Sequence, residues 1–418
     1  MNIFRRIRNR VSDTHFLALD IGTESVKASI VEPEGKRGKI IGYAKENQKL
    51  FDMQSGTITD ISSVILNCQK AISKAENMAG VSTRKMVLGV SGEIVHGATF
   101  STSFVRRDPS AKIDMSELKH IIQKVQWKAF DEIRSQMSFE TGYNELDVRL
   151  VNASIVDTSI DGYRVTNPIG FQGKVVNMTL FNSFSPLVFF GTIQTIAAEI
   201  DKEIMALSSM PFALCTSLFE EEKQKISAIF IDVGAGSTDI GVVRDGVVKG
   251  TRMFTIGGRT FSKRLSKALN ISYYDAEQIK LSYSNDKLER QSHRIIREAL
   301  KNDVDVWLSG VVLSLEYFKD EEENLPSKIL LSGGAASLPE IKEALETREW
   351  VKSLPFDKKP QISFYNPKLV PGISFDYKIF NDHSDIMSIA LAKNGLSLIS
   401  EDALSTKVLK KVVRLMQM

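Results

Sequence analysis

The chain has 418 residues, with 54 Lys and Arg against 51 Asp and Glu, and hydrophobic residues make up 43% of it. This composition is typical of a globular protein and argues against a disordered or collagen-like chain, while the length predicts two or more domains. No apolar run approaches the roughly 20 residues of a membrane-spanning helix, no secretory leader is recognisable, and the two cysteines are expected to be reduced core thiols.

The cations are concentrated at the two ends of the chain. Four arginines and no acids lie in residues 1–11, and four Lys or Arg and no acids lie in residues 403–418. The other 46 cations are outnumbered by the 51 acids, so the body is mildly acidic. This distribution argues against a broad nucleic-acid surface, and we expect no nucleic-acid partner. It favours two cationic tails, each with a specific partner.

Residues 1–12 predict a short basic amphipathic leader. Ile3, Phe4, Ile7 and Val11 fall on one side of a helix drawn through this segment. A disordered basic leader is an equally good interpretation of so short a segment.

A first β-hairpin is predicted at residues 17–31, where two apolar strands flank an Asp-x-Gly turn. The turn contains Asp20, Gly22 and Thr23. Glycine lets the backbone approach a ligand closely, and the N–H groups of such a turn can line an anion site. An Asp at the strand end can orient a hydrated Mg²⁺. Taken alone, the turn also fits an ordinary hairpin.

An insertion of about eighty residues follows the first group of elements. Before it we expect strands at 40–44 and 86–92 and a helix at 60–78 that Asp60 caps. The insertion itself carries a helix at about 114–134 and a terminal Asn-Pro-Ile-Gly-Phe-Gln-Gly tract at 167–173. Its strands are expected near 96–105, 149–157 and 174–182, and a helix at 191–205 returns to the first lobe.

The hairpin pattern returns 212 positions later, at residues 229–243. Its turn contains Asp232, Gly234, Gly236, Ser237 and Thr238. Two such turns facing each other would hold the phosphate tail of a nucleotide between two halves of the protein. The repetition of the pattern therefore favours a phosphate clamp over two unrelated hairpins.

A third element at residues 327–341 reads as a buried strand, a Gly333-Gly334-Ala335 turn and a helix that Pro339 opens. Such a turn lets the backbone pack flat against a base or ribose. A tight strand-to-helix connection without a ligand is the alternative. Long helices are expected at 291–318 and 384–398, and the acidic run 320–323 is interpreted as a solvated linker.

The last segment, residues 401–418, predicts a cationic amphipathic helix. Its apolar half-face consists of Leu404, Val408, Leu409, Val412, Val413, Leu415 and Met416. An apolar face backed by cations is typical of a helix lying in an anionic membrane interface. The alternative is a final helix that packs on the body with its lysines outward.

In order and character, the three turn elements resemble the phosphate-1, phosphate-2 and adenosine motifs of the actin-like ATPase superfamily. This resemblance implies an α/β fold with two ribonuclease-H-like lobes. The insertion after the 86–92 strand, with its Asn-Pro-Ile-Gly tract, resembles the 1C (SHS2-like) subdomain of the FtsA family of bacterial cell-division proteins. The Ala276-Glu277-x-Ile279-Lys280 segment and the cationic tail also resemble FtsA.

The resemblance implies a division of the chain into six parts. These are a leader at 1–12, lobe 1A at 13–92 and 176–210, subdomain 1C at 93–175, lobe 2A at 211–255 and 327–400, subdomain 2B at 256–326, and the C-terminal helix at 401–418.

It also implies ATP and Mg²⁺ as ligands. Asp20 and Asp232 would orient the hydrated metal. Phosphate would meet Gly22, Thr23, Gly234, Gly236, Ser237 and Thr238, and adenosine would meet Glu277, Lys280, Gly333, Gly334 and Ala335. Without the hairpin motifs, Glu277 and Lys280 would read as an exposed helix ion pair.

By this resemblance, the protein is expected on the cytoplasmic face of the membrane, self-associated into filaments and tethering an FtsZ-like polymer. The tail, and the leader as a second contact, would meet the anionic lipid. Residues 207–219 offer no convincing catalytic base, so we expect ATP binding with slow or absent hydrolysis. A scaffold like the pilus-assembly protein PilM is the nearest alternative, and a small-molecule kinase of the superfamily is a weaker one. Unlike FtsA, this chain has almost no linker before the tail, so the tail helix is also a candidate to dock on the body.

Overall fold

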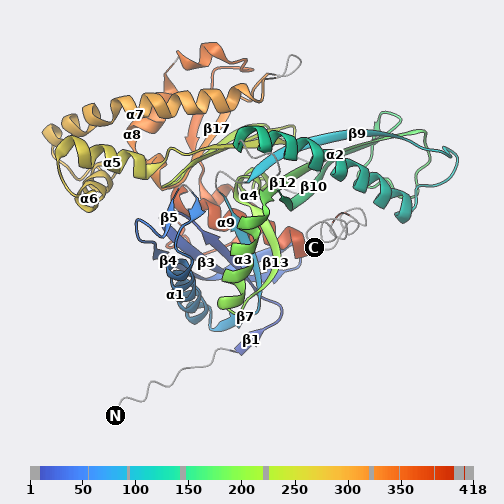
Figure 1. Ribbon diagram of the computed structural model, residues 1–418, viewed down its shortest axis with the longest axis horizontal. Helices are drawn as coiled ribbons and strands as arrows, with labels where there is room; N and C mark the ends of the chain where they lie inside the picture. The colour runs from blue at the N-terminus through green and yellow to red at the C-terminus, as the bar shows by residue number, and fades with distance from the viewer. Residues whose placement is uncertain are drawn as a thin grey trace.

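The computed structural model describes residues 10–54, 56–91, 95–141, 147–219, 226–319, 324–347, 349–380, 382–399 and Leu409. The expected mixed α/β architecture is confirmed. Two lobes face each other, and an elongated insertion projects to one side of them (Figure 1). The expected N-terminal leader, the acidic run 320–323 and the C-terminal helix apart from Leu409 lie outside the described residues.

The first lobe is built on a six-stranded sheet with the order β13-β8-β2-β3-β4-β19. Alternate residues of β2 face opposite sides: Leu17 and Leu19 pack with one hydrophobic cluster, Phe16 and Ala18 with another. Helices α1 (Ile61–Ala79) and α3 (Leu187–Glu199) cover the first side, and α9 (Ile386–Ile399) and α4 (Met210–Thr216) cover the second. The strands are β2 (Phe16–Ile21), β3 (Ser25–Glu34), β4 (Arg37–Asn47), β8 (Lys85–Val90), β13 (Glu203–Ser209) and β19 (Ile373–Ser374).

Helix α1 begins where the sequence predicts. The Asp60 side chain accepts a hydrogen bond from the Ser63 N–H, which satisfies one of the donors left free at a helix start. The helix ends at Gly80, whose φ of 71° is the left-handed conformation that glycine adopts without strain.

The second lobe shares one nine-stranded sheet with the insertion, in the order β11-β10-β12-β9-β16-β15-β14-β17-β18. Helices α5 (Gly258–Leu269), α6 (Tyr273–Ser284), α7 (Arg290–Glu316) and α8 (Pro339–Glu346) pack on the second-lobe half. The strands of that half are β14 (Ala228–Val233), β15 (Thr238–Arg244), β16 (Val247–Phe254), β17 (Lys328–Ser332) and β18 (Gln361–Phe364).

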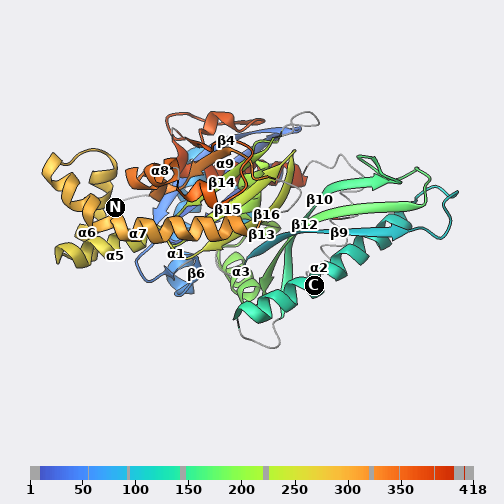
Figure 2. The ribbon, with the colours of Figure 1, turned by 90° about the horizontal axis from the view of Figure 1, so that it is seen from above.

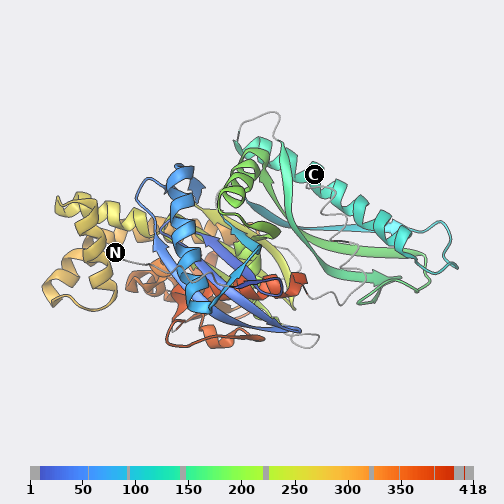
Figure 3. The ribbon, with the colours of Figure 1, turned by 90° about the horizontal axis from the view of Figure 1, so that it is seen from below.

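The insertion half of that sheet carries one long helix, α2 (Met115–Thr141), along one face (Figures 2 and 3). Its strands are β9 (His96–Val105), β10 (Val148–Ile160), β11 (Tyr163–Arg164) and β12 (Val175–Pro186). Because β12 continues to Pro186, the insertion sheet extends beyond residue 175, where we expected the insertion to end. The finer division into subdomains stays a prediction.

The junction between the insertion and the second lobe is short. Strand β9 meets β16 at two residue pairs, Gly250 with Ala98 and Thr251 with Gly97. The insertion is thus joined covalently to the first lobe, through β8 and β13, but by sheet hydrogen bonds to the second. The sequence alone did not indicate this second attachment.

One predicted helix is wrong in its extent. Instead of a helix at 191–205, α3 ends at Glu199 and β13 pairs parallel with β8. Between them Asp201 has a positive φ of 53°, which breaks the helix. Pairing with a buried strand overrides the helical pattern here.

Two observations bear on the expected membrane contact. None of the helices in the described part of the chain has the length and apolar character that a bilayer crossing needs. Leu409, the described residue of the tail, is helical and 3% exposed, and it packs in the hydrophobic cluster of the insertion.

The β9–β16 junction yields a stability prediction. A Cβ at Gly97 would press on Thr251 Oγ1 and lie 2.7 Å from Phe181 Cζ. We expect Gly97→Ala to lower the free energy of unfolding by about 1–3 kcal/mol through this overpacking. Hydrogen exchange should also accelerate at residues 96–100 and 247–252.

The matched control is Gly191→Ala in α3, where a Cβ meets nothing within 4 Å. Helix propensity predicts stabilisation by about 0.5–1 kcal/mol there. Chemical denaturation of both variants measures whether each substitution lowers or raises the free energy of unfolding. Equal effects would contradict the proposed crowding at the junction.

Candidate functional site

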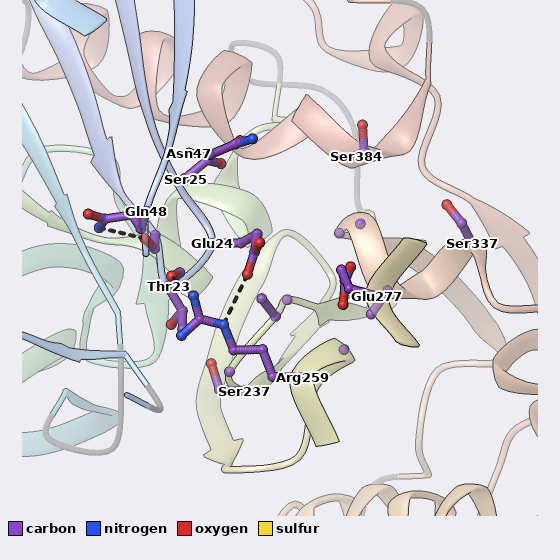
Figure 4. A pocket seen from close by; sticks show the side chains of 18 of the residues that line it. Thr23, Glu24, Ser25, Asn47, Gln48, Ser237, Arg259, Glu277, Ser337 and Ser384 are labelled. Atoms are coloured by element: carbon purple, nitrogen blue, oxygen red, sulfur yellow. Dashed lines mark hydrogen bonds and ion pairs between the residues drawn. The ribbon is translucent and has the colours of Figure 1, made fainter. Parts of the chain in front are cut away.

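A cavity of about 640 Å³ lies between the two lobes, and both hairpin turns line it (Figure 4). The structure brings nearly all the predicted site residues to its wall. They are Asp20, Gly22, Thr23, Asp232, Gly234, Gly236, Ser237, Glu277, Lys280, Gly333, Gly334 and Ala335.

Thr238 is the exception among the predicted site residues. Its side chain is fully buried, and its hydroxyl donates to the Ile256 carbonyl at 2.7 Å and accepts from Trp307 Nε1 at 2.9 Å. Thr238 is the first residue of β15, and this places it in the core behind the turn. The structure therefore does not support the expected phosphate contact by this side chain.

The two hairpin turns are copies in geometry as well as in sequence. The Gly22 N–H donates to the Ser25 carbonyl at 3.1 Å, and the Gly234 N–H donates to the Ser237 carbonyl at 2.9 Å. In each hairpin the Asp pairs with the residue seven positions later, Lys27 in the first and Asp239 in the second. The equivalent register presents the same backbone surface to the cavity from both lobes.

Three carboxylates lie at the cavity wall, Asp20 and Asp239 buried and Asp232 half-buried. Burial, opposed by Lys27 but reinforced by Asp232, raises the pKa of Asp20 to about 6. Burial also raises the pKa of Asp232, although Ser332 Oγ donates to its Oδ1 at 2.7 Å. The pKa of Asp239 is raised well above its usual range by burial and by the other two acids. Buried negative charge of this kind favours a cation.

The acids suit a metal held through water rather than directly. Within the described ranges no group of three or more Asp, Glu, His or Cys side chains is placed to chelate an ion. Mg²⁺ commonly keeps several waters and takes only one or two protein carboxylates. The donor set therefore fits a hydrated Mg²⁺ beside Asp20 and Asp232.

Lys27 supplies a cation that the sequence analysis missed. Its ammonium lies 2.9 Å from the Asp385 carboxylate and 3.1 Å from the Ser384 carbonyl. Burial alone would lower the pKa of Lys27, but Asp385 and Asp20 outweigh it and the pKa is raised. The expected hairpin register could have indicated the place of Lys27 in the site, because it sets Lys27 opposite Asp20.

Helix α6 brings Glu277 and Lys280 to the wall as a buried pair. Lys280 Nζ donates to Glu277 Oε2 at 2.8 Å, to Ser262 Oγ at 2.8 Å and to the Gly258 carbonyl at 3.1 Å. These bonds use all three ammonium donors. Lys280 therefore offers a ligand its aliphatic stem, whereas Glu277 keeps a second carboxylate oxygen as an acceptor.

The turn after β17 requires glycine. Gly333 has a φ of 89°, and a Cβ there would collide with the Val233 carbonyl. At Gly334 a Cβ would meet nothing within 4 Å, and the residue lines the cavity. The turn thus packs against the second hairpin on one side and leaves a flat backbone surface on the other.

Glu24 and Arg259 also line the cavity and were not predicted as site residues. Arg259 Nε lies 2.9 Å from Glu24 Oε2 across the two lobes (Figure 4). Glu24 lies in the first hairpin turn and Arg259 follows Gly257 and Gly258, but the two residues are 235 positions apart, so no local pattern could have paired them.

Comparison with known proteins finds similarity to one family. The family model described as "Cell division protein FtsA" matches residues 229–374. FtsA of Enterococcus hirae is 25% identical over 78% of this chain and 74% of its own length. FtsA of Pseudomonas aeruginosa is 21% identical over 96% of this chain and 97% of its own length. The chain is thus similar in sequence to FtsA proteins over most of its length.

The fold of this chain is similar to that of a solved structure. The structure titled "PilM-PilN type IV pilus biogenesis complex" superposes with a TM-score of 0.64 at 17% identity, over 91% of this chain and 98% of that chain. This similarity shows the fold, and the expected actin-like architecture is confirmed.

The raised pKa of Asp20 predicts how stability depends on pH. The folded state holds the proton more tightly than the unfolded chain, so stability falls as pH rises from about 4 through 6. At pH 7.5 without ligand, Asp20→Asn should raise the free energy of unfolding by on the order of 2 kcal/mol. The gain should shrink on acidification to pH 4.5, as followed by denaturant titration.

Asp245→Asn is the control, because Asp245 is exposed in a turn with a φ of 52° that Asn also adopts. It should leave both stability and its pH dependence unchanged. A destabilised Asp20→Asn protein at pH 7.5 would mean that the carboxylate is not a buried charge.

Proposed function

We propose that this FtsA-like protein binds Mg·ATP between its lobes and acts in cell division, assembling at the cytoplasmic membrane and tethering an FtsZ-like polymer. The observation that carries the nucleotide proposal is the pair of matching turns on opposite walls of one cavity. The division role is supported by similarity to proteins named cell division protein FtsA, one of them over 96% of this chain.

The proposed phosphate contacts are mostly backbone. Gly22 and Thr23 would donate from the first lobe, and Gly234, Gly236 and Ser237 from the second, because turn N–H groups form anion-binding concavities. Mg²⁺ bound there would neutralise phosphate charge. Asp20 and Asp232 would hold its waters, and Lys27 would balance the remaining charge.

The proposed adenosine contacts come from the second lobe. Glu277 would accept from ribose hydroxyls, and the Lys280 stem would pack on the nucleoside. Gly333, Gly334 and Ala335 would form the floor beneath the base. All five line the same cavity as the phosphate turns, which supports one continuous ligand site.

We also propose that the protein hydrolyses ATP slowly or not at all. Phosphoryl transfer needs a group that orients the attacking water. Residues 207–219, which connect the lobes, contain no Asp, Glu, His, Lys or Gln, and Glu220–Glu222 lie outside the described residues. We therefore expect turnover far below the roughly 10 s⁻¹ of a typical enzyme.

The proposed membrane contact depends on the tail. Leu409 belongs to the apolar face predicted for the tail helix, and it is buried against the insertion. For that face to enter lipid, Leu409 would have to leave this contact. The same contact favours the PilM-like alternative, in which the protein is a scaffold whose membrane anchor belongs to a partner.

Nucleotide binding is tested with a fluorescent ATP analogue and Mg²⁺. Asp232→Ala removes a proposed metal-orienting group, and Gly234→Val puts a side chain where phosphate would lie, so each should weaken binding at least about 100-fold. Circular dichroism must show both variants folded, and Asp245→Asn should bind as the parent does. Unchanged affinity in both folded variants would refute the proposed site.

Membrane binding is tested by flotation with vesicles containing anionic lipid. The full chain should float, and the chain ending at Ser400 should float much less, with loss of binding at high salt. Equal flotation of both would remove the tail as the anchor. No flotation of either would favour the PilM-like scaffold.

A further inference from the structure

Arg259, the second residue of α5, crosses from the second lobe to the first. Its side chain is 10% exposed, and it forms hydrogen bonds to first-lobe atoms. Nε donates to Glu24 Oε2 at 2.9 Å, and one terminal nitrogen donates to the Thr23 carbonyl at 2.8 Å. The other terminal nitrogen donates to the carbonyls of Leu50 at 2.9 Å and Met53 at 2.8 Å. Four of the five guanidinium N–H donors are therefore used across the cleft.

The backbone of the same residue is fixed to the second hairpin turn. The Arg259 N–H donates to the Ala235 carbonyl at 2.8 Å, and the Gly258 N–H donates to the Gly234 carbonyl at 2.9 Å. A Cβ at Gly257 would lie 2.7 Å from both of those carbonyl oxygens, so glycine permits the close approach. One residue thus binds Thr23 in the first turn and Ala235 in the second.

The segment that contains Leu50 and Met53, two of the Arg259 partners, also supports the first turn. Gln48 Nε2 donates to the Gly22 carbonyl at 3.1 Å, and its N–H donates to the Glu24 carbonyl at 2.8 Å. The Gly56 N–H donates to Thr23 Oγ1 at 3.1 Å. The segment 48–56 and the first turn therefore form one hydrogen-bonded unit, and Arg259 holds it at three carbonyls and a carboxylate.

Lys280 and Arg264 do not share this arrangement. The Lys280 ammonium is bound to Gly258, Ser262 and Glu277, all within the second lobe. Arg264, one turn further along α5, pairs with Asp303 of α7 at 2.5 Å, also within the second lobe. Arg259 is the cation of α5 whose bonds must break when the lobes separate at the turns.

We propose that Arg259 is a latch between the lobes that couples the two phosphate turns and limits the rate at which a bound nucleotide escapes. The nucleotide part rests on the proposed function, whereas the latch itself is a property of the ligand-free protein. Its bonds are charge-assisted, the guanidinium itself is largely buried although Glu24 is partly exposed, and the planar group matches four acceptors at once. A lysine at the same place has only three donors on a single nitrogen and cannot span them.

The test compares Arg259→Ala with Arg264→Ala in the full chain. Without nucleotide, hydrogen exchange at residues 21–25 and 48–56 should accelerate at least about tenfold in Arg259→Ala, as expected for loss of charge-assisted bonds worth above 1.4 kcal/mol. Exchange in the α7 core should stay unchanged. Arg264→Ala, which removes an ion pair inside one lobe, should leave 21–25 and 48–56 as they are.

With a fluorescent ATP analogue and Mg²⁺, stopped-flow displacement should show a dissociation rate at least about tenfold higher in Arg259→Ala and a smaller change in the association rate. Arg259→Lys should recover only part of the difference. Glu24→Gln keeps the three carbonyl bonds and should raise dissociation less than Arg259→Ala. It also serves as the readable variant if Arg259→Ala fails to fold.

Unchanged exchange at 21–25 and 48–56 in folded Arg259→Ala, or in Arg259→Lys if Arg259→Ala does not fold, would overturn the latch. Accelerated exchange with an unchanged dissociation rate would overturn its control of nucleotide release. If the parent protein binds no nucleotide, the proposed function fails, and the exchange experiment still decides whether Arg259 holds the lobes together.

Discussion

The structure depends on holding three buried or half-buried carboxylates at one cavity between the two lobes. Asp20, Asp232 and Asp239 each have a raised pKa, so the ligand-free fold is held against the cost of burying acids. Lys27 offsets part of this cost but is itself engaged by Asp385. A cation therefore has a larger stabilising effect here than at an ordinary surface site. The buried acids lower the stability of the ligand-free protein, and the same acids would favour the binding of a charged ligand.

The local features of this site could be read from sequence because they depend on neighbours in the chain. Asp-x-Gly turns between apolar strands fix both hairpins, and the Asp60 cap fixes the start of α1. The positive φ of Gly333 explains why that turn needs glycine. In each case the residues that determine the backbone lie within a few positions of one another, so pattern and structure agree.

The features that sequence missed depend on pairings between distant segments. Thr238 looks like another hydroxyl of the turn, but strand β15 has already begun there and its side chain faces Trp307. The stretch 191–205 has a helical pattern, yet its second half is recruited as a strand by β8. The Glu24–Arg259 pair and the β9–β16 junction join residues more than 150 positions apart. No single-segment pattern contains that information.

The links between the lobes differ in kind, and this difference determines how the lobes can move. Helices α4 and α9 sit in one hydrophobic cluster with Phe16 of the first lobe and Phe230 of the second. Apolar contacts of this type are non-directional and tolerate small rotations. The Arg259 contacts at the cavity are directional hydrogen bonds that rotation would break. A rotation of the lobes would therefore break the Arg259 bonds at the cavity before it disrupted the apolar cluster.

The insertion is affected by any such rotation, because its chain connections belong to the first lobe while its sheet is bonded to the second through β9 and β16. If the lobes rotate about the α4–α9 cluster, the two residue pairs of that junction must shift or the insertion must tilt with the second lobe. A short junction between two longer, well-packed half-sheets is the place where such strain concentrates. A rotation of the lobes would therefore act on the insertion at this junction, where Gly97 and Gly250 lie.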